Sequence, residues 1–266
     1  MLNDLEMICI DLPKKHKKIN VYALGDVHVG SAEFDEAAVR KKIGIIMDDP
    51  DGVVALCGDL GDFGLKNSKT NVYQQTMSPA AQVEYIYDLF KPLAEANKVI
   101  AAVPGNHEER LVREVGICPL YDLCVRWGIS DRYRENVAVL KISFGAINGG
   151  KSKQVVTGIV THGSTRSKHK KFIAGFDGID FAISGHTHTP EYSPHGKIRV
   201  DANKSTAKLV PYKEIVVDAH LKPGGYGLKK EYEISPPAEL QYLECFINRV
   251  NCGHFDKHLD FHSIQI

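Results

Sequence analysis

The chain has 266 residues, 43% of them hydrophobic and 25% charged, and equal numbers of basic and acidic residues give it a formal net charge of zero. This composition is ordinary for a globular protein of one large domain or two small ones. Zero net charge excludes an overall field that draws the chain to nucleic acid or membranes, although a local basic patch would be enough for nucleic acid.

The lack of a recognisable targeting signal and the spacing of the cysteines favour a cytoplasmic protein. The N-terminus lacks an apolar run of signal-peptide length, and the other apolar runs fall far short of the roughly 20 residues that a membrane helix needs. The six cysteines form no C-x-x-C pair, so we expect reduced thiols, with Cys57 and Cys245 in the core. We expect no membrane partner.

Short apolar segments rich in β-branched residues predict buried strands at 19–24, 52–56, 98–103, 155–161 and 179–184. Helical patterns lie between the early strands, at 33–48 after Ser31 and at 79–97 with Ser78 as N-cap and Pro79 at the first position. Strands that alternate with helices favour an α/β layer structure. We predict a single domain over 1–266, with second-sheet strands in 191–250 and a tail at 251–266.

Each of these five strands is followed at once by residues able to bind a metal. A glycine precedes the first of them in four cases, which permits a sharp turn. Because ligands bind beyond the carboxyl ends of strands in open α/β sheets, we expect these side chains at one edge. They are Asp26, His28, Asp59, Asp62, Asn106, His107, Glu108, His162, His186 and His188.

The donor types indicate which metals such a site would hold. Imidazole and carboxylate without thiolate suit Mn, Fe, Zn or Ni, and we expect manganese first. Seven ligands are too many for one tetrahedral ion, but with a bridging carboxylate they suit two ions about 3.5–4 Å apart, the usual site for attack on phosphorus. A single D-x-H or G-H-x-H motif would more often be a turn or a satisfied histidine; their joint occurrence favours metal.

The motifs D-x-H (26–28), G-D-x-x-D (58–62), G-N-H-E (105–108), His162 and G-H-x-H (185–188) resemble the calcineurin-like metallophosphoesterase superfamily. The resemblance implies a four-layer α/β/β/α sandwich with two packed mixed sheets. It also implies one ion on Asp26, His28, Asp59 and His188, and a second on Asp59, Asn106, His162 and His186. Asp59 would be the bridging carboxylate.

The resemblance further implies a reaction. A hydroxide between the two ions would attack phosphorus, with His107 as general acid or as stabiliser of the leaving oxygen, oriented by Asp62. Phe63 stands where the protein-phosphatase branch has a phosphate-gripping arginine, which disfavours a phosphoprotein phosphatase. The segments around Asp26 and Asp59 look more like the nuclease and phosphodiesterase branch and like enzymes encoded in phage and prophage DNA.

The substrate is less well defined by the sequence. We expect hydrolysis of phosphodiester bonds in nucleic acid or nucleotides, with Arg110, Arg166 and Lys168 as candidate phosphate contacts. A solvated basic face is an equal alternative for the 164–172 segment. The alternatives for the whole protein are a phosphomonoesterase or pyrophosphohydrolase of small metabolites, and a scaffold that kept the fold and lost catalysis. The oligomeric state stays open.

The C-terminal tail carries His254, His258 and His262 at intervals of four residues. This spacing predicts an amphipathic helical terminus with its histidines on one face, and a metal site or partner-binding helix is the alternative.

Overall fold

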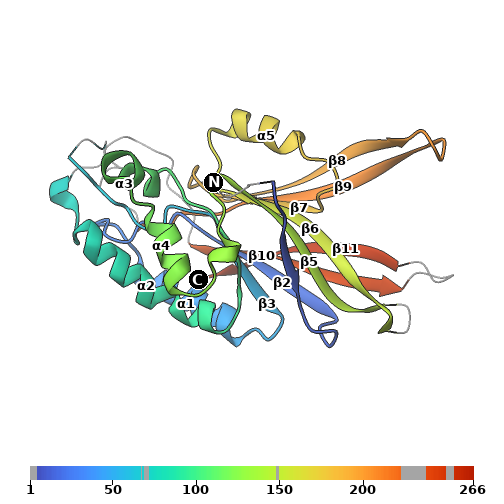
Figure 1. The fold of residues 1–266 in the computed structure, drawn as a ribbon, viewed down its shortest axis with the longest axis horizontal. Coiled ribbons are helices and arrows are strands. Elements are labelled where there is room, and N and C mark those ends of the chain that lie inside the picture. Colours follow the sequence, from blue (N-terminus) through green and yellow to red (C-terminus); the bar gives the residue numbers. More distant parts are fainter. Residues whose placement is uncertain (1–4, 67, 69–71, 148–149, 223–237, 250–254) are drawn as a thin grey trace.

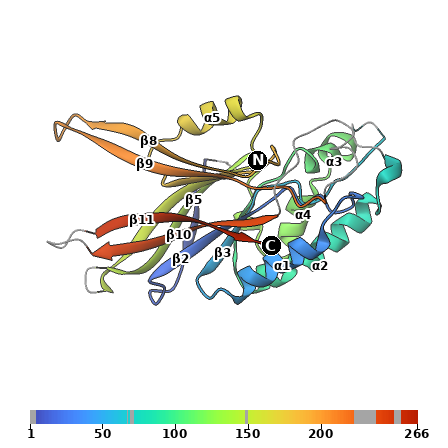
Figure 2. The ribbon, with the colours of Figure 1, turned by 180° about the vertical axis from the view of Figure 1, so that it is seen from behind.

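The computed structural model describes the whole chain except residues 1–4, 67, 69–71, 148–149, 223–237 and 250–254. Two β-sheets pack face to face, and helices cover the outer surface of each (Figures 1 and 2). The predicted four-layer α/β/β/α sandwich with two mixed sheets is therefore confirmed.

One sheet has five strands in the order β11-β10-β2-β3-β4. Strands β2, β3 and β4 run parallel, whereas β10 is antiparallel to both β2 and β11. The strands are β2 (Lys18–Leu24), β3 (Gly52–Leu56), β4 (Val99–Ala102), β10 (Glu239–Arg249) and β11 (Phe255–Gln265).

The other sheet has six strands in the order β1-β5-β6-β7-β9-β8. Strands β6, β7 and β9 run parallel to one another, and β8 returns antiparallel to β9 as a long ribbon (Figure 1). The strands are β1 (Ile8–Asp11), β5 (Val137–Ile147), β6 (Ser152–Thr161), β7 (Phe181–Ser184), β8 (Glu191–Asp201) and β9 (Thr206–Val216).

From the sequence we expected the strands after residue 190 to form a second sheet of their own. The structure shows that they do not. Strands β8 and β9 complete the six-stranded sheet, and β10 and β11 complete the five-stranded one. Each sheet is begun by earlier strands, so the later hairpins extend an existing edge. The prediction over 191–250 is thus corrected to two hairpins, one on each sheet.

The inner faces of the two sheets form a common hydrophobic core. Val21 and Ala55 from the five-stranded sheet belong to the same buried cluster as Leu140, Val160 and Ile183 from the six-stranded sheet. Because the central strands are covered on both faces, their residues need not alternate between apolar and polar. This explains the continuous apolar runs in the sequence.

Helices cover the outer faces of both sheets. The five-stranded sheet packs against α1, α2, α3 and α4, and the six-stranded sheet packs against α5. Their bounds, with those of two short 3₁₀ turns, are α1 (Glu36–Asp48), η1 (Val72–Gln74), α2 (Pro79–Glu95), α3 (Glu108–Val115), α4 (Pro119–Arg126), η2 (Ser130–Arg132) and α5 (Arg166–Ala174).

The starts of the two long helices illustrate what the sequence indicates locally. Helix α2 begins at Pro79, and the hydroxyl of Ser78 accepts a hydrogen bond from the Ala81 amide, as predicted. Helix α1 begins later than predicted, because Asp35 and not Ser31 accepts the capping hydrogen bond. Ser31 donates to Glu33 instead.

The C-terminal tail is a strand and not a helix, which corrects the prediction. His258 and His262 lie on β11, where their rings stack on Phe246 and Tyr242 of β10. His254 lies outside the described residues. An interval of four keeps side chains on one face of a strand as well as of a helix, because four is a multiple of the strand period. Backbone pairing with β10 makes this segment a strand and not a helix.

Two further expectations can be compared with the described residues. None of their helices is both long and apolar enough to cross a membrane. Cys57 and Cys245 are buried, as expected, and the five cysteines within the described part of the chain are free thiols.

Candidate metal centre

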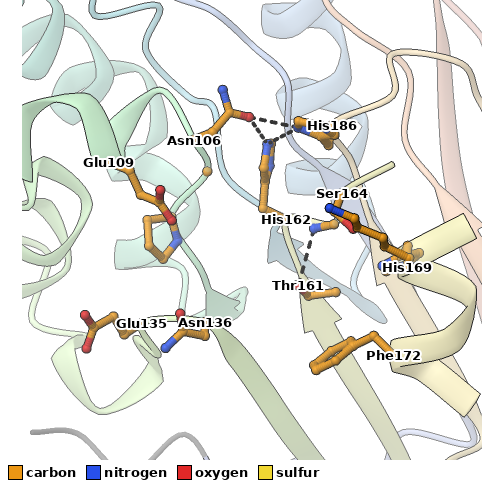
Figure 3. Close-up of a pocket in the computed structure, with 14 residues that line it drawn as sticks. Asn106, Glu109, Glu135, Asn136, Thr161, His162, Ser164, His169, Phe172 and His186 are labelled. Carbon is orange, nitrogen blue, oxygen red and sulfur yellow. Dashed lines mark hydrogen bonds between the residues drawn. The ribbon is translucent and has the colours of Figure 1, made fainter. Parts of the chain in front are cut away.

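The predicted ligand residues meet at the carboxyl ends of the parallel strands. Asp26, Asp59 and Asn106 follow β2, β3 and β4 of one sheet. His162 and His186 follow β6 and β7 of the other sheet. Because the sheets pack face to face, these ends adjoin, and Asn106 contacts both histidines across the interface (Figure 3).

The backbone that presents these side chains is strained. Eight non-glycine residues of the described chain have positive φ. Five of them are predicted ligands, namely Asp26, His28, Asp59, His186 and His188. L-residues seldom adopt this left-handed conformation, and such strain typically gathers at functional sites. The left-handed turn directs each side chain toward the neighbouring strand end.

The glycines before the ligands are needed for space. A Cβ atom on Gly105 would lie 2.1 Å from Asp59 Oδ1, and one on Gly185 would lie 2.5 Å from Asp26 Oδ2. Any side chain at these positions would displace a predicted ligand. The glycine that precedes each motif therefore permits close approach between loops of different strands.

A first group of donors consists of Asp26, His28 and His188. His28 Nε2 and His188 Nε2 are 3.1 Å apart, and His188 Nε2 is 3.7 Å from Asp26 Oδ1. The Asp26 carboxylate is fully buried, and Oδ1 has no hydrogen-bond partner. A buried carboxylate oxygen without a partner is costly unless a cation or proton occupies the space beside it.

A second group of donors consists of Asp59, Asn106, His162 and His186. Asn106 Oδ1 lies 3.1 Å from His162 Nε2 and 2.8 Å from His186 Nδ1, and the two imidazole nitrogens are 3.3 Å apart. His162 Nε2 also lies 3.3 Å from Asp59 Oδ2. His162 Nδ1 donates to the Cys57 carbonyl at 2.8 Å, which leaves the Nε2 lone pair facing this group.

Four of the six distances given for the two groups lie in the range expected around a shared ion, and the other two, 3.7 and 2.8 Å, lie close to it. Donor atoms at about 2.1 Å from one ion lie roughly 3.0–3.4 Å from each other in tetrahedral or octahedral geometry. Asp59 connects the two groups, since its carboxylate lies near Asp26 and His28 of the first group and near His162 of the second. These residues therefore fit divalent metal ions.

The pKa values of these groups show where positive charge is favoured. Burial raises the pKa of the Asp26 carboxyl, and the nearby Asp59 adds to the shift. Burial alone would lower the pKa of His162, but the Asp59 carboxylate outweighs it and raises the pKa to about 10. Protonation of these donor groups is therefore favoured, and a divalent metal ion would have to displace the protons in order to bind.

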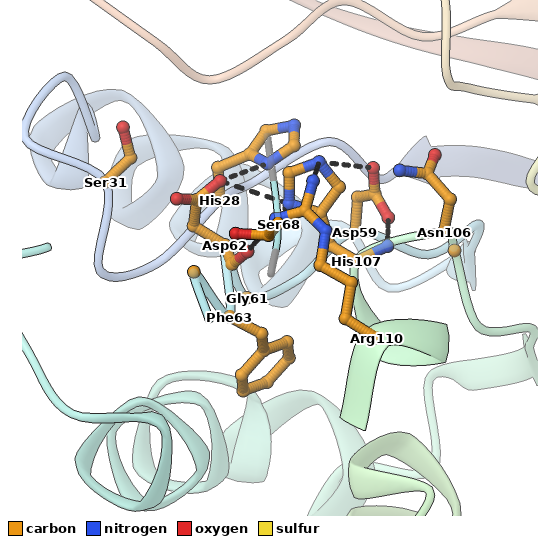
Figure 4. Close-up of polar contacts among 12 residues, drawn as sticks. His28, Ser31, Asp59, Gly61, Asp62, Phe63, Ser68, Asn106, His107 and Arg110 are labelled. Carbon is orange, nitrogen blue, oxygen red and sulfur yellow. Dashed lines mark hydrogen bonds and ion pairs between the residues drawn. The ribbon is translucent and has the colours of Figure 1, made fainter. Parts of the chain in front are cut away.

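His107 lies beside this centre and is oriented by Asp62, as predicted (Figure 4). Its Nδ1 donates to the Asp62 carbonyl at 2.8 Å and lies 3.1 Å from the Asp62 carboxylate. Its Nε2 accepts from Arg110 Nη2 at 2.8 Å and lies 3.7 Å from Asp59 Oδ2. Gln75 also donates to Asp62 Oδ2, at 2.5 Å, which fixes the carboxylate from the opposite side.

The role of Glu108 could not be assigned from the sequence. Its carboxylate is buried and accepts four backbone hydrogen bonds, from the amides of Asp59, Leu60, Gly61 and Gly105. These amides belong to two separate loops, so Glu108 ties the loop after β3 to the loop after β4. It supports the ligands and does not point among them.

Sequence reasoning missed a sixth strand end at this edge. Strand β9 runs parallel to β7 and leads into Asp218 and His220, which are both buried. The His220 amide donates to the Asp26 carbonyl at 2.9 Å, and Asp218 forms a buried ion pair with Lys42 at 2.9 Å. The signal was present, because residues 214–220 repeat the pattern of an apolar run followed by aspartate and histidine.

The three candidate phosphate contacts lie in different surroundings. Arg110 is at the centre, where it also donates to the Asp62 carbonyl at 2.8 Å. Lys168 lines a cavity of about 460 Å³ that begins at Asn106, His162 and His186. Arg166 pairs with Glu191 on β8 and lies beside a smaller cavity of about 190 Å³. The structure therefore brings only Arg110 into contact with the predicted catalytic residues.

Comparison with known proteins agrees with this geometry. The family model for calcineurin-like phosphoesterases matches residues 19–190. A search of curated proteins found no match.

The solved structures found by comparison are distant in sequence, and their TM-scores are below 0.5. A conserved uncharacterized protein of Streptococcus pneumoniae TIGR4, described as a predicted phosphoesterase, is 13% identical with a TM-score of 0.37, over 91% of this chain and 98% of that one. Entamoeba histolytica Vps29 in complex with zinc is 13% identical with a TM-score of 0.40, over 93% and 99%. Chaetomium thermophilum Vps29 is 8% identical with a TM-score of 0.39, over 93% and 98%.

Proposed function

Because the chain belongs to the calcineurin-like phosphoesterase family, we propose that it is a dinuclear metal-dependent hydrolase of phosphodiester bonds. The observation that carries the proposal is the position of Asp59 between two groups of donors from different strands. One group offers Asp26, His28 and His188, and the other offers Asn106, His162 and His186. In each of the two groups, acceptor atoms lie close together, and a cation between them would relieve their repulsion.

Divalent ions held by these residues would polarise the phosphoryl group and activate a water molecule for attack on phosphorus. Manganese is the first choice, with iron, zinc or nickel as alternatives that the same nitrogen and oxygen donors accept. His162 is oriented for this role by the Cys57 carbonyl. His188 is suited because desolvation by the surrounding protein and the nearby His28 lower its pKa to about 3, which keeps the imidazole neutral.

His107 is proposed to act on the leaving oxygen. Asp62 fixes one ring nitrogen, so that the other, Nε2, faces the centre. Arg110 donates to this Nε2, and its guanidinium can turn instead to a non-bridging phosphate oxygen when substrate is present. Once Arg110 has turned away, Nε2 can take up a proton, because Asp62 and Asp59 outweigh burial and raise the pKa of His107. The imidazolium would then give this proton to the leaving oxygen or stabilise its charge, a contribution typically worth 10²–10⁴-fold in rate.

The surroundings favour a diester over a monoester. A phosphomonoester carries up to two negative charges near neutral pH, whereas a diester carries one. Phe63 occupies the position of the additional arginine in protein phosphatases, and its side chain is buried in the hydrophobic core beneath the sheet. Of the two candidate arginines, Arg110 contacts the predicted catalytic residues and Arg166 pairs with Glu191, and a single guanidinium at the site suits a substrate with one charge.

Hydrolysis of two model esters tests the proposal. We expect the manganese-loaded protein to cleave bis-p-nitrophenyl phosphate faster than p-nitrophenyl phosphate. We also expect Asp59→Asn to lose at least one bound ion and at least 100-fold in rate. Asp122→Asn, an exposed carboxylate on α4, is the matched control.

The outcomes separate the alternatives. A preference for the monoester would identify a phosphomonoesterase of small metabolites. Two bound ions without cleavage of any phosphoester would identify a scaffold that kept the metal site. Full activity and unchanged metal content in Asp59→Asn would refute the bridging role.

A further inference from the structure

The 460 Å³ cavity beside the candidate metal centre is larger than hydrolysis of a phosphate group alone would require. Asn106, His162 and His186 form one end of it, and it extends away from them between the segment at 135–136 and helix α5 (Figure 3). Cavities of roughly 300–1,000 Å³ are typical sites for organic ligands of some size. The space is therefore larger than a phosphoryl group requires, and it is continuous with the candidate metal ligands.

The charges in the cavity limit what can occupy its far end. Glu109 and Glu135 line one side (Figure 3), Glu109 pairs with Arg113, and Lys168 also lines the cavity. These charges balance, so the far end offers no excess of positive charge to attract a second phosphate or a polyanionic chain. The cavity therefore suits an uncharged organic group beyond the phosphoryl group.

The wall formed by α5 offers an aromatic surface. Phe172 lines the cavity, and its side chain is 45% exposed, which is unusual for a phenylalanine. Its ring meets Phe176 edge-on, with centroids 5.2 Å apart and an interplanar angle of 68°. One face of a ring in such a pair stays available for stacking by a flat ligand.

A buried histidine next to Phe172 supplies a hydrogen-bonding group. His169 is 5% exposed and lines the cavity, yet its Nε2 has no hydrogen-bond partner. The nearest anion is Glu214 Oε1 at 3.5 Å, while the other oxygen of Glu214 binds His195 Nε2 at 2.6 Å. Glu214 lines the neighbouring 190 Å³ cavity, which His169 also lines. A buried ring nitrogen with only this long contact to a carboxylate is rare in native proteins and leaves His169 open to a further hydrogen bond with a ligand.

From these observations we propose that the cavity binds a nucleobase-type heterocycle carried by the phosphodiester. The base stacks on Phe172, while its polar edge reaches His169 on one side and the amide of Asn136 on the other. Amide and carboxylate groups pair well with the ring N–H and amino groups of bases. This inference rests on the proposed function, since the phosphoryl group is placed at the metal centre.

Calorimetric binding to the manganese-saturated full chain tests the inference without turnover. The probes are the 5′-methylenephosphonate analogue of guanosine monophosphate, whose P–C bond is not an ester, and ethylphosphonate, which lacks the base. We expect the nucleoside probe to bind at least tenfold more tightly. Phe172→Ala removes most of this difference, because stacking of one base typically contributes about tenfold or more. Phe172→Tyr retains it, as does the matched control Lys171→Ala, an exposed neighbour on α5 outside the cavity.

The outcomes distinguish a failure of the base-binding cavity from a failure of the proposed hydrolase. Equal affinity for both probes, or a difference that survives in Phe172→Ala, overturns the base-binding cavity even if bis-p-nitrophenyl phosphate is cleaved. Tighter binding of methylenediphosphonate than of the nucleoside probe also overturns it, since the occupant would then be anionic. A tenfold preference for the nucleoside probe without any ester cleavage supports the cavity and refutes the hydrolase.

Discussion

Replacing Glu108 by glutamine removes one charge from the carboxylate that joins the loops after β3 and β4. The side chain keeps its size, but one of its oxygens becomes an NH₂ group. Oε2 accepts from the amides of Asp59 and Gly105, and Oε1 accepts from those of Leu60 and Gly61. Whichever way the new amide turns, two backbone donors lose their acceptor.

The size of the effect follows from burial. A buried donor without an acceptor costs about 1–3 kcal/mol, so two of them cost about 2–6 kcal/mol. Part of this is offset, because burial and the nearby Asp59 raise the pKa of Glu108 and make its charged form unfavourable. We expect a net loss of about 3 kcal/mol in the free energy of unfolding, which lowers Tm by about 6–12 °C for a chain of this size.

Thermal denaturation followed by circular dichroism measures this loss, and metal content after gel filtration reports on Asp59. The matched control is Glu109→Gln on the same helix. Glu109 is half-exposed and pairs with Arg113 at 2.5 Å, a surface interaction worth about 0–1 kcal/mol. If Glu108→Gln were as stable as Glu109→Gln and kept its metal, the two loops would not depend on this carboxylate.

Three other changes have expected outcomes of their own. Lys42→Met leaves the buried Asp218 carboxylate without its ion-pair partner and should lower the free energy of unfolding by about 3–5 kcal/mol, measured by urea denaturation. The control Lys41→Met, at an exposed position of the same helix, should change it by no more than about 0.5 kcal/mol. Equal losses would contradict the buried ion pair. Ser78→Ala should cost about 1 kcal/mol and Ser78→Gly only a few tenths in the same assay, unless the α2 cap is dispensable. At a Mn²⁺ concentration 100-fold above the dissociation constant, metal binding adds about 2.7 kcal/mol to the free energy of unfolding. Removal of the metal by a chelator should therefore lower Tm by about 5–11 °C. An unchanged Tm would argue against metal in the folded protein.

The strand ends could be predicted because they combine two local signals. An apolar run predicts a buried strand, and the glycine that follows it predicts a sharp turn into the next residue. Gly105 and Gly185 show why the second signal is informative, since each leaves room for a carboxylate from another loop. Both signals occur in four of the five strands and the apolar run alone in the fifth, and together they were sufficient to predict a candidate site at one edge of the fold.

What escaped prediction depends on contacts between distant segments. Glu108 follows Asn106 and His107 in sequence and has the same metal-binding chemistry, but the four amides around it direct it to the backbone. The division of the last four strands between two sheets is likewise set by pairing with earlier strands, namely β10 with β2, more than 100 residues before it, and β9 with β7. Local periodicity contains no information about such partners.

The left-handed backbone at the candidate metal centre restricts which amino acids this site can use during evolution. Asp26, Asp59 and the histidines at 28, 186 and 188 belong to the few residue types that tolerate positive φ. Glutamate would coordinate a metal equally well, yet each such conformation costs a longer side chain about 1–3 kcal/mol. A lineage that no longer bound metal would be free to relieve this strain through glycine. Loss of function would then become visible in its sequence first at these five positions, while the rest of the fold stayed recognisable.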